Sequence, residues 1–391
     1  MTTQEAERII YLDNAATTFP KPDCVWKAMR EYFFHIGGNP GRSGHRLSFK
    51  ASEILFDTRE TLARLFNIGI SERIVFTKNA TEAINLALLG LLSPEDRVVT
   101  TAMEHNAVMR PLRHLERTQG IQVDVVPADA RGLLDMESLA RSLGEKAALL
   151  VVNHASNVAG SLVDLEQAGI LAKGAGVPLM VDGAQTGGCY PTDVEAMHIS
   201  ILAFTGHKGL LGPQGTGGLY VAPGLEPVPF ILGGTGSHSE LEEQPTFWPD
   251  IHESGTPNAV GIAGLKAGVE FVMEKGVERI RAHEEGLFRR FWQGAKEMPG
   301  VLLYGPESWK DRTAVVSFNI EGIDPAYVGY TLDKEFSIMV RPGLHCAPSA
   351  HKTLGTFPQG TVRMAFGFFN THKDVDVVLE ALWAIGRRNH G

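Results

Sequence analysis

Lys208 occupies an unusual position for a lysine. It follows the apolar run Leu202-Ala203-Phe204 and precedes the glycine-rich stretch Gly209-Leu210-Leu211-Gly212. Partial burial there would disfavour the charged ammonium and lower the pKa of the lysine. The neutral amine is the form that attacks carbonyl groups to make imines, so this position favours Schiff-base chemistry. The alternative is a lysine that extends its charge into solvent from the end of a strand.

Other polar side chains follow apolar runs in the same way. Because ligands of open α/β sheets bind beyond the carboxyl ends of the strands, we expect these side chains to share one site with Lys208. Thr81 follows Ile74-Val75-Phe76, His105 follows Val98-Val99-Thr100, Asn157 follows the run 149–152, and Asp182 follows Leu179-Met180-Val181.

Asp182 needs a partner, because a carboxylate at the end of an apolar run is costly when it is left alone. A protonated pyridine nitrogen would be such a partner. Pyridoxal 5'-phosphate (PLP) carries one and needs it protonated to act as an electron sink. The alternative is that Asp182 caps a helix beginning at Gly183-Ala184-Gln185.

Two further residues fit the same kind of ligand. The sequence Asn79-Ala80-Thr81-Glu82 opens a helical pattern, and the backbone N–H groups and hydroxyl there suit a phosphate, although an ordinary helix cap reads the same way. His105 could stack on a planar ring or be a buried histidine of the core.

A second group of reactive residues lies near the C-terminus, in Arg341-Pro342-Gly343-Leu344-His345-Cys346-Ala347-Pro348. Proline and glycine place Cys346 on a loop, where the adjacent His345 could favour the thiolate; an incidental loop cysteine is the alternative. Arg363 lies in a strand-like run and either binds a substrate carboxylate in a fork or is an exposed strand residue. Cys24 and Cys189 are expected to be structural.

The elements that position these residues alternate along the chain. Short apolar runs alternate with helical stretches such as 81–92 and 165–175, which predicts a doubly wound, mostly parallel sheet covered on both faces. The expected strands are 74–76, 98–100, 123–126, 148–152, 178–181, 199–204 and 218–221.

The pattern changes after Gly255-Thr256-Pro257-Asn258. Long helical patterns over 259–275 and 277–296 precede two expected strands, 313–318 and 361–365, and a last amphipathic helix, 374–387. We therefore predict a large α/β domain at 20–258 and a smaller α+β domain made of 1–19 and 259–391.

Composition excludes several classes of protein. The 391 residues include 36 Lys+Arg and 45 Asp+Glu, a net charge of −9 that argues against nucleic-acid binding. No apolar span is long enough to cross a membrane, and the polar N-terminus is not a secretory signal, so a cytoplasmic protein is expected. Three scattered cysteines predict neither disulfides nor a metal site.

The assembled motifs resemble those of the cysteine desulfurases in the class V aminotransferase group, in the branch close to selenocysteine lyase. The likeness covers nearly the whole chain. It is carried by Tyr11-Leu12-Asp13-Asn14-Ala15-Ala16-Thr17-Thr18, Asn79-Ala80-Thr81-Glu82-Ala83-Ile84-Asn85, Met103-Glu104-His105, Ser156-Asn157, Val181-Asp182-Gly183-Ala184-Gln185, Gly206-His207-Lys208, Gly255-Thr256-Pro257-Asn258 and the stretch 341–347.

The resemblance implies a fold type I PLP enzyme that forms a homodimer with an active site shared across the interface. It gives each motif residue a role. Lys208 would hold PLP as a Schiff base, Asp182 would pair with the ring nitrogen, Gln185 with the phenolic oxygen, and His105 would stack on the ring; Ala80, Thr81, Thr205 and His207 would bind the phosphate with Thr256 of the partner subunit; Asn157 and Arg363 would hold the substrate carboxylate, and His45 would lie near the mouth of the site.

The resemblance also implies a reaction. Cys346 matches the catalytic cysteine of the subgroup with an R-x-G-x-H-C-A loop. L-cysteine would lose its Cα proton to Lys208, and the Cys346 thiolate would attack the substrate sulfur, leaving a persulfide and L-alanine. The sulfur would pass to an acceptor protein for iron–sulfur cluster or sulfur-cofactor assembly. The stretch 233–253 resembles the family only loosely, which leaves the identity of that acceptor open.

Other functions remain possible at this point. Selenocysteine lyase or cysteine sulfinate desulfinase activity would use the same scaffold. An aminotransferase or epimerase would make Cys346 incidental, and a catalytically silent partner protein would need no cofactor.

Overall fold

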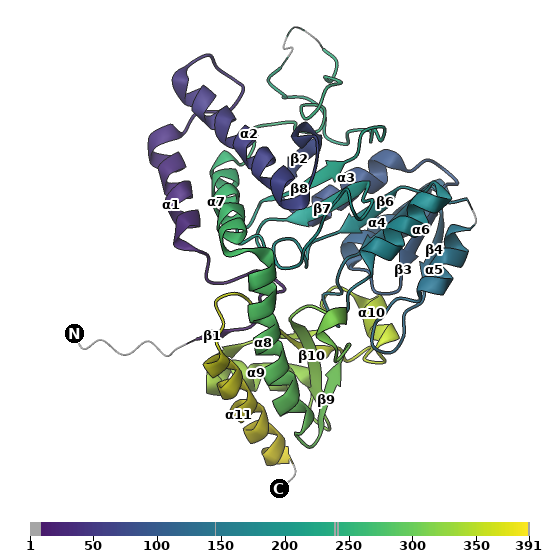
Figure 1. Ribbon diagram of the computed structural model, residues 1–391, viewed down its shortest axis with the longest axis vertical. Coiled ribbons are helices and arrows are strands. Elements are labelled where there is room, and N and C mark those ends of the chain that lie inside the picture. The colour runs from purple at the N-terminus through teal and green to yellow at the C-terminus, as the bar shows by residue number, and fades with distance from the viewer. Residues whose placement is uncertain (1–8, 145, 238–239, 241, 390–391) are drawn as a thin grey trace, which may run out of the picture.

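The computed structural model describes residues 9–389 except 145, 238–239 and 241. Residues 1–8 and 390–391 of the expected smaller domain, and three residues of the stretch 233–253, therefore lie outside the described residues. Figure 1 shows two layers of structure along the long axis, with a large sheet above and a smaller helix-covered sheet below.

The large sheet has seven strands in the order β2-β8-β7-β6-β5-β3-β4. Neighbouring strands are parallel except that β8 runs antiparallel to both β2 and β7. All seven match the apolar runs expected from the sequence. They are β2 (Ile74–Thr77), β3 (Arg97–Thr101), β4 (Gln122–Val126), β5 (Leu149–Asn153), β6 (Leu179–Asp182), β7 (Ile201–Thr205) and β8 (Gly217–Val221).

The central strands lack polar alternation because both of their faces are covered. Every residue of β5, β6, β7 and β8 is buried. Successive side chains of a strand point to opposite faces. In β5, Leu150 and Val152 accordingly join one apolar cluster, whereas Leu149 and Val151 join the other.

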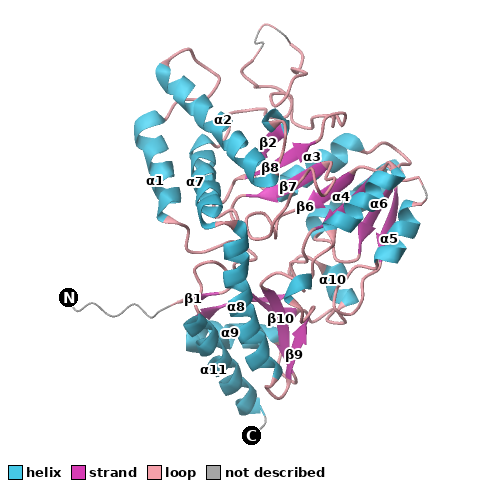
Figure 2. Cartoon of the chain, in the orientation of Figure 1, coloured by secondary structure: helices cyan, strands magenta, loops and turns pink. Residues whose placement is uncertain are grey.

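Helices cover both faces of this sheet (Figure 2). Side chains of α3 (Ala80–Leu91) and α4 (Asn106–Gln119) contribute to one apolar cluster. The opposite cluster receives side chains from α2 (Arg46–Phe66), α5 (Met136–Leu143), α6 (Leu165–Ala175) and α7 (Ala259–Lys275). The remaining N-terminal elements are α1 (Asp23–Glu31), the π-helix η1 (Tyr32–Ile36) and the short η2 (Ser71–Arg73).

Several strands run into a helix through a polar capping residue. Asn79 accepts a hydrogen bond from the backbone N–H of Glu82 at 3.0 Å and starts α3. The Nδ1 atom of His105 accepts one from the backbone N–H of Ala107 at 3.0 Å and starts α4. These caps fix the chain at the strand ends, where the expected site residues lie.

The C-terminal part is built on a four-stranded antiparallel sheet in the order β12-β13-β10-β9. A short β1 pairs in parallel with β11, so the N-terminal chain joins this part. The elements are β1 (Ile10–Tyr11), α8 (Val277–Lys296), β9 (Val301–Tyr304), η3 (Trp309–Asp311), β10 (Val315–Ile320), α9 (Pro325–Phe336), β11 (Ile338–Met339), β12 (Arg341–Gly343), α10 (Pro348–Thr353), β13 (Thr361–Ala365) and α11 (His372–Asn389).

The small sheet has an apolar core of its own, separate from the two clusters that cover the faces of the large sheet. One cluster gathers side chains of α8, β10 and α11 with Ile10 and Leu12 of the N-terminal chain. Helix α7 packs against α1 and α2, which lie beside the large sheet. Helix α8 follows α7 in the chain and runs into the lower part of the molecule (Figure 1). The predicted division into a domain at 20–258 and a domain at 1–19 and 259–391 stays a prediction. Helix α7 belongs to the second of these ranges but packs with the helices of the large sheet. Within the described residues, no helix is long and apolar enough to span a membrane.

Candidate active site

A cavity at the carboxyl ends of the large sheet gathers most of the residues singled out in the sequence. Its lining also includes Asn153 at the end of β5 and Ala184 after β6. The expected site residues that line it are Ala80, Thr81, His105, Asn157, Asp182, Gln185, Thr205, His207 and Lys208.

The chain before Lys208 packs tightly at Gly206. A Cβ atom there would lie 2.1 Å from Oγ1 of Thr216, so a larger residue would force the side chain of Thr216 to move. Burial lowers the pKa of Lys208 to about 8, an effect that the charge of Asp182 opposes. At pH 7, about a tenth of this amine is therefore uncharged and nucleophilic, far more than for an ordinary lysine.

Asp182 is the last residue of β6 and is buried against the same cavity. Burial raises the pKa of its carboxyl group, whereas the N–H of Ala184 and the charge of Lys208 lower it. Its Oδ1 atom accepts a hydrogen bond from Ala184 N at 3.0 Å. The residues that follow form turns, so the alternative in which Asp182 caps a helix is wrong.

Several polar atoms of the cavity lining have no partner among the described residues. They are Oγ1 of Thr205, Nδ1 of His207 and Oδ1 of Asn157, all buried. Such atoms are costly unless a ligand or water satisfies them. Together with Thr81 at the N-terminus of α3, they fit an anionic phosphate and other polar groups of a bound molecule. The residues present therefore fit a phosphorylated ring compound that has a carbonyl group for Lys208.

His105 presents a neutral ring to this cavity. Its Nδ1 atom accepts the hydrogen bond from Ala107, which leaves the proton on Nε2. Burial, and then the charge of Lys208, lowers the pKa of His105 to about 4. An uncharged imidazole can stack on a planar ligand without repelling a positive ring nitrogen.

The loop that carries Cys346 is bonded directly to this site. Asn157 donates from Nδ2 to the carbonyl oxygen of His345 at 2.7 Å, and the N–H of Asn106 donates to that of Cys346 at 2.8 Å. The thiol is exposed. His345 and Cys346 have φ angles of 49° and 59°, in the left-handed region that non-glycine residues rarely adopt. This strained turn presents the sulfur outward beside the cavity.

His345 does not fill the role that its position beside Cys346 suggested. Its ring is buried, and Nε2 lies 3.2 Å from the carbonyl oxygen of Thr361. Burial, and then the charge of Arg363, lowers its pKa to about 2, so it is uncharged and cannot stabilise a thiolate. Arg341 lies near the sulfur instead, with Nη2 at 3.6 Å from Sγ of Cys346.

Arg363 is a buried residue of β13, so the alternative of an exposed strand residue is wrong. Its Nη2 atom donates to Oδ1 of Asp13 at 2.7 Å, and Nη1 donates to the carbonyl oxygen of Asn157 at 3.2 Å. The buried Nε has no partner among the described residues. The Nε–H donor of the guanidinium is thus left for a ligand at the edge of the site.

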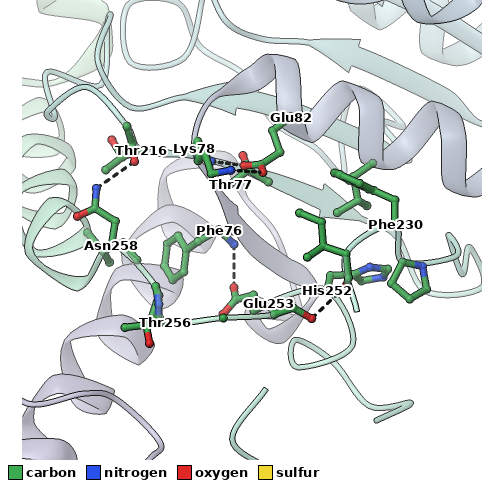
Figure 3. Close-up of a pocket in the computed structure, with 18 residues that line it drawn as sticks. Phe76, Thr77, Lys78, Glu82, Thr216, Phe230, His252, Glu253, Thr256 and Asn258 are labelled. Atoms are coloured by element: carbon green, nitrogen blue, oxygen red, sulfur yellow. Dashed lines mark hydrogen bonds and ion pairs between the residues drawn. The ribbon is translucent and has the colours of Figure 1, made fainter. Parts of the chain in front are cut away.

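Two expected site residues lie away from the cavity. Thr256 lines a second pocket with Phe76 and Glu253 (Figure 3), and its hydroxyl accepts a hydrogen bond from Asn39 at 3.4 Å. His45 caps α2 by accepting from the N–H of Ser48 at 3.2 Å. Within one chain, neither lines the cavity that contains Lys208.

Sequence reasoning gave no individual role to Arg341, Asp13 or Lys21. The first two stand inside motifs that carried the family resemblance, which was the available signal. No pattern marks Lys21. In the part of the chain that the structure describes, no group of three His, Cys, Asp or Glu side chains is placed to hold a metal ion.

Comparison with known proteins agrees with this arrangement. Residues 10–378 match the family model described as Aminotransferase class-V. The chain belongs to the class V aminotransferase family. Among curated members, it is 36% identical over 384 residues to a probable cysteine desulfurase of Pyrococcus abyssi, covering 96% of this chain and 94% of the relative. A probable cysteine desulfurase of Methanothermobacter thermautotrophicus is 36% identical over 380 residues, covering 95% and 94%.

Solved structures of cysteine desulfurases have the same fold. The apo structure of a cysteine desulfurase from Thermococcus onnurineus superposes with a TM-score of 0.92 at 36% identity, covering 97% of this chain and 95% of that one. The cysteine desulfurase CsdA of Escherichia coli gives a TM-score of 0.86 at 29% identity, covering 96% and 94%. The expected fold, a mostly parallel seven-stranded sheet with a smaller α+β part, is confirmed.

Proposed function

We propose that this protein is a PLP-dependent cysteine desulfurase, which converts L-cysteine to L-alanine and takes up the sulfur as a persulfide on Cys346. One observation carries the proposal. The exposed thiol of Cys346 lies on a loop that is hydrogen-bonded to Asn157 and Asn106, next to a cavity that contains a lysine of low pKa. The relatives named as cysteine desulfurases over nearly the full chain support the same activity.

The cavity residues divide the work of binding the cofactor. Lys208 would be the attachment point, Asp182 would pair with the ring nitrogen, Gln185 with the phenolic oxygen, and His105 would stack on the ring. The unpartnered Thr205 and His207, with Ala80 and Thr81 at the start of α3, suit the phosphate. When bound, PLP supplies an electron-withdrawing ring that stabilises negative charge at the substrate Cα.

The chain supplies the substrate contacts and the proton transfer. Arg363, whose Nε has no partner among the described residues, would hold the substrate carboxylate together with Asn157. Lys208, once its amine is released, accepts the Cα proton, which suits a pKa of about 8.

Cys346 carries out the sulfur transfer. Its thiolate attacks the sulfur of the substrate, a sulfur–sulfur bond forms, and the substrate carbon–sulfur bond breaks with its electron pair going to the substrate Cβ. Protonation of that carbon, and return of a proton from Lys208 to Cα, yield alanine. Nη2 of Arg341 lies 3.6 Å from Sγ of Cys346 and donates a hydrogen bond to it.

The direct test is incubation of the purified protein with L-cysteine and a thiol reductant, with sulfide and alanine measured together. We expect equal amounts of both. Cys346→Ala should abolish their formation, whereas Cys24→Ala, whose half-buried thiol donates to the carbonyl of Ala267, should leave it unchanged. Alanine formation without sulfide would contradict the proposal.

The alternatives predict different results. A selenocysteine lyase would release selenium from selenocysteine even in Cys346→Ala, and a desulfinase would prefer cysteine sulfinate. An aminotransferase or epimerase would turn over substrate with Cys346→Ala unimpaired. A silent partner protein would show no visible absorbance that borohydride removes.

We also propose that the protein is a homodimer whose sites are shared. Thr256 and His45 lie away from the Lys208 cavity of their own chain, so they can take part only if they approach the cavity of a second copy. The persulfide would then be passed to an acceptor protein at the exposed Cys346, for iron–sulfur cluster or sulfur-cofactor assembly.

A further inference from the structure

The segment 13–21, here called the strap, joins the two parts of the active site. At one end, Asp13 is paired with Arg363 of the small sheet, and Asn14 donates to the carbonyl oxygen of Ala365 at 2.8 Å. In its middle, the carbonyl oxygen of Ala15 accepts from Nε2 of Gln185 at 3.1 Å. The strap therefore runs from the expected carboxylate-binding arginine toward the cofactor-binding cavity.

The other end of the strap binds the backbone around Lys208. The carbonyl oxygen of His207 accepts from the N–H of Thr18 at 3.0 Å, from the hydroxyl of Thr17 at 3.1 Å and from Nζ of Lys21 at 2.6 Å. The hydroxyl of Thr18 lies 3.1 Å from the carbonyl oxygen of Lys208 and accepts from Lys21 itself. The peptide that leads into Lys208 is thus held by one short segment.

Lys21 is the charged member of this set. It is half-buried, and burial lowers its pKa to about 8. Within the described residues, no carboxylate forms an ion pair with it, and its ammonium binds a carbonyl and a hydroxyl instead. A charge-assisted bond of this kind is about twice as strong as a neutral one and holds its acceptor more rigidly. Desolvating an ammonium without a counter-ion is costly, so the arrangement points to a positional role.

We propose that Lys21 is a positioning residue for Lys208. By holding the carbonyl group of His207, it fixes the direction in which His207 and Lys208 enter the cavity. The inference rests on the proposed attachment of PLP to Lys208, and it adds a residue from outside the cavity lining. Without the ammonium, the peptide would lose its strongest donor and the amine would sample more orientations.

The rate at which PLP forms an imine with the cofactor-free protein tests this inference, followed by visible absorbance. Borohydride reduction and peptide mapping would show whether the imine is on Lys208. In Lys21→Met we expect the rate to fall about ten- to a hundredfold, the range that corresponds to loss of one hydrogen bond to a charged group. Lys21→Arg should recover part of the rate. Lys27→Met, which changes an exposed lysine on the helix that follows, α1, should react like the parent protein.

Equal rates in Lys21→Met and Lys27→Met would overturn the inference, as would an arginine variant no faster than the methionine variant. If Lys21→Met does not fold, Lys21→Gln serves instead, because it removes the charge and shortens the side chain but keeps a polar end; a rate equal to that of the parent protein there has the same meaning. A parent protein that forms no imine at all would contradict the proposed cofactor. An imine that forms equally fast in every variant would contradict only the role of Lys21.

Discussion

Lys208 should react with PLP mainly as a neutral amine. Burial lowers its pKa to about 8, so the reactive fraction falls about tenfold for each pH unit below that value and is nearly complete above it. In the cofactor-free protein, the rate of imine formation should therefore rise up to about pH 8 and then level off. A rate that keeps rising toward pH 10, the range of an ordinary lysine near 10.4, would contradict this account of the site.

Asp182 should matter for turnover more than for attachment of the cofactor. Asp182→Asn keeps the shape of the side chain and leaves Lys208 in place, so the absorbance that borohydride removes should persist. Alanine formation should drop by about a hundredfold or more, since a preorganised charge opposite the reacting group is lost. Comparison of the absorbance spectrum and the rate in the same sample separates the two effects, and an unchanged rate would remove Asp182 from the mechanism.

At the level of single residues, the pattern indicated Thr81, His105, Asn157, Asp182 and Lys208 because each follows an apolar strand. The family resemblance added Ala80, Gln185, Thr205 and His207. The sequence could not indicate how loop residues turn. His345 precedes Cys346 in the chain, yet the positive φ angles of both residues send its ring toward Thr361, and Arg341 lies near the sulfur instead. The pairing of Asp13 with Arg363 joins residues 350 positions apart, which no local pattern reveals.

At the level of elements, the segment that presents Thr256 is held by a largely buried ion pair. Arg59 pairs with Glu253, whose Oε1 atom also accepts from the N–H of Phe76 at 2.8 Å. Removing one partner of such a pair leaves the other charge buried without a partner, which typically costs about 3 kcal/mol of folding stability. We expect Glu253→Ala to lower the free energy of unfolding by roughly that amount, measured by urea denaturation. The exposed Glu243→Ala is the matched control, and equal stability of the two variants would show that the pair contributes nothing.

The long strands and helices were predictable because an element that spans several helical turns or several strand residues leaves a clear pattern of apolar residues in the sequence. The seven strands of the large sheet and helices α7 and α8 agree with the expected ranges. Strands β1, β11 and β12 have two or three residues, too few to show a period, and form because tertiary contacts bring them together. The antiparallel direction of β8 was also beyond local sequence, since it depends on how the chain crosses the sheet.

At the level of the whole molecule, we expect a second copy of the chain to bind at the surface formed by α1, η1 and α2. Large apolar side chains there are unusually exposed, including Phe33 at 69% and Phe34 at 66%. Patches of this kind mark interfaces. The protein should sediment as a dimer, and a Phe33→Asp, Phe34→Asp double variant should sediment as a monomer with reduced turnover. Trp383→Asp, at the distant helix α11, should remain dimeric; a monomeric parent protein would contradict the shared site.

The measurement that tests the central claim most directly is the mass of the peptide that contains Cys346 after one turnover. The protein is mixed with L-cysteine without reductant, alkylated, digested and analysed by mass spectrometry. We predict that the Cys346 peptide gains the mass of one sulfur atom, in proportion to the alanine formed, while the Cys24 and Cys189 peptides do not. Alanine formed in the same sample without added sulfur on Cys346 would contradict the proposed route of sulfur transfer.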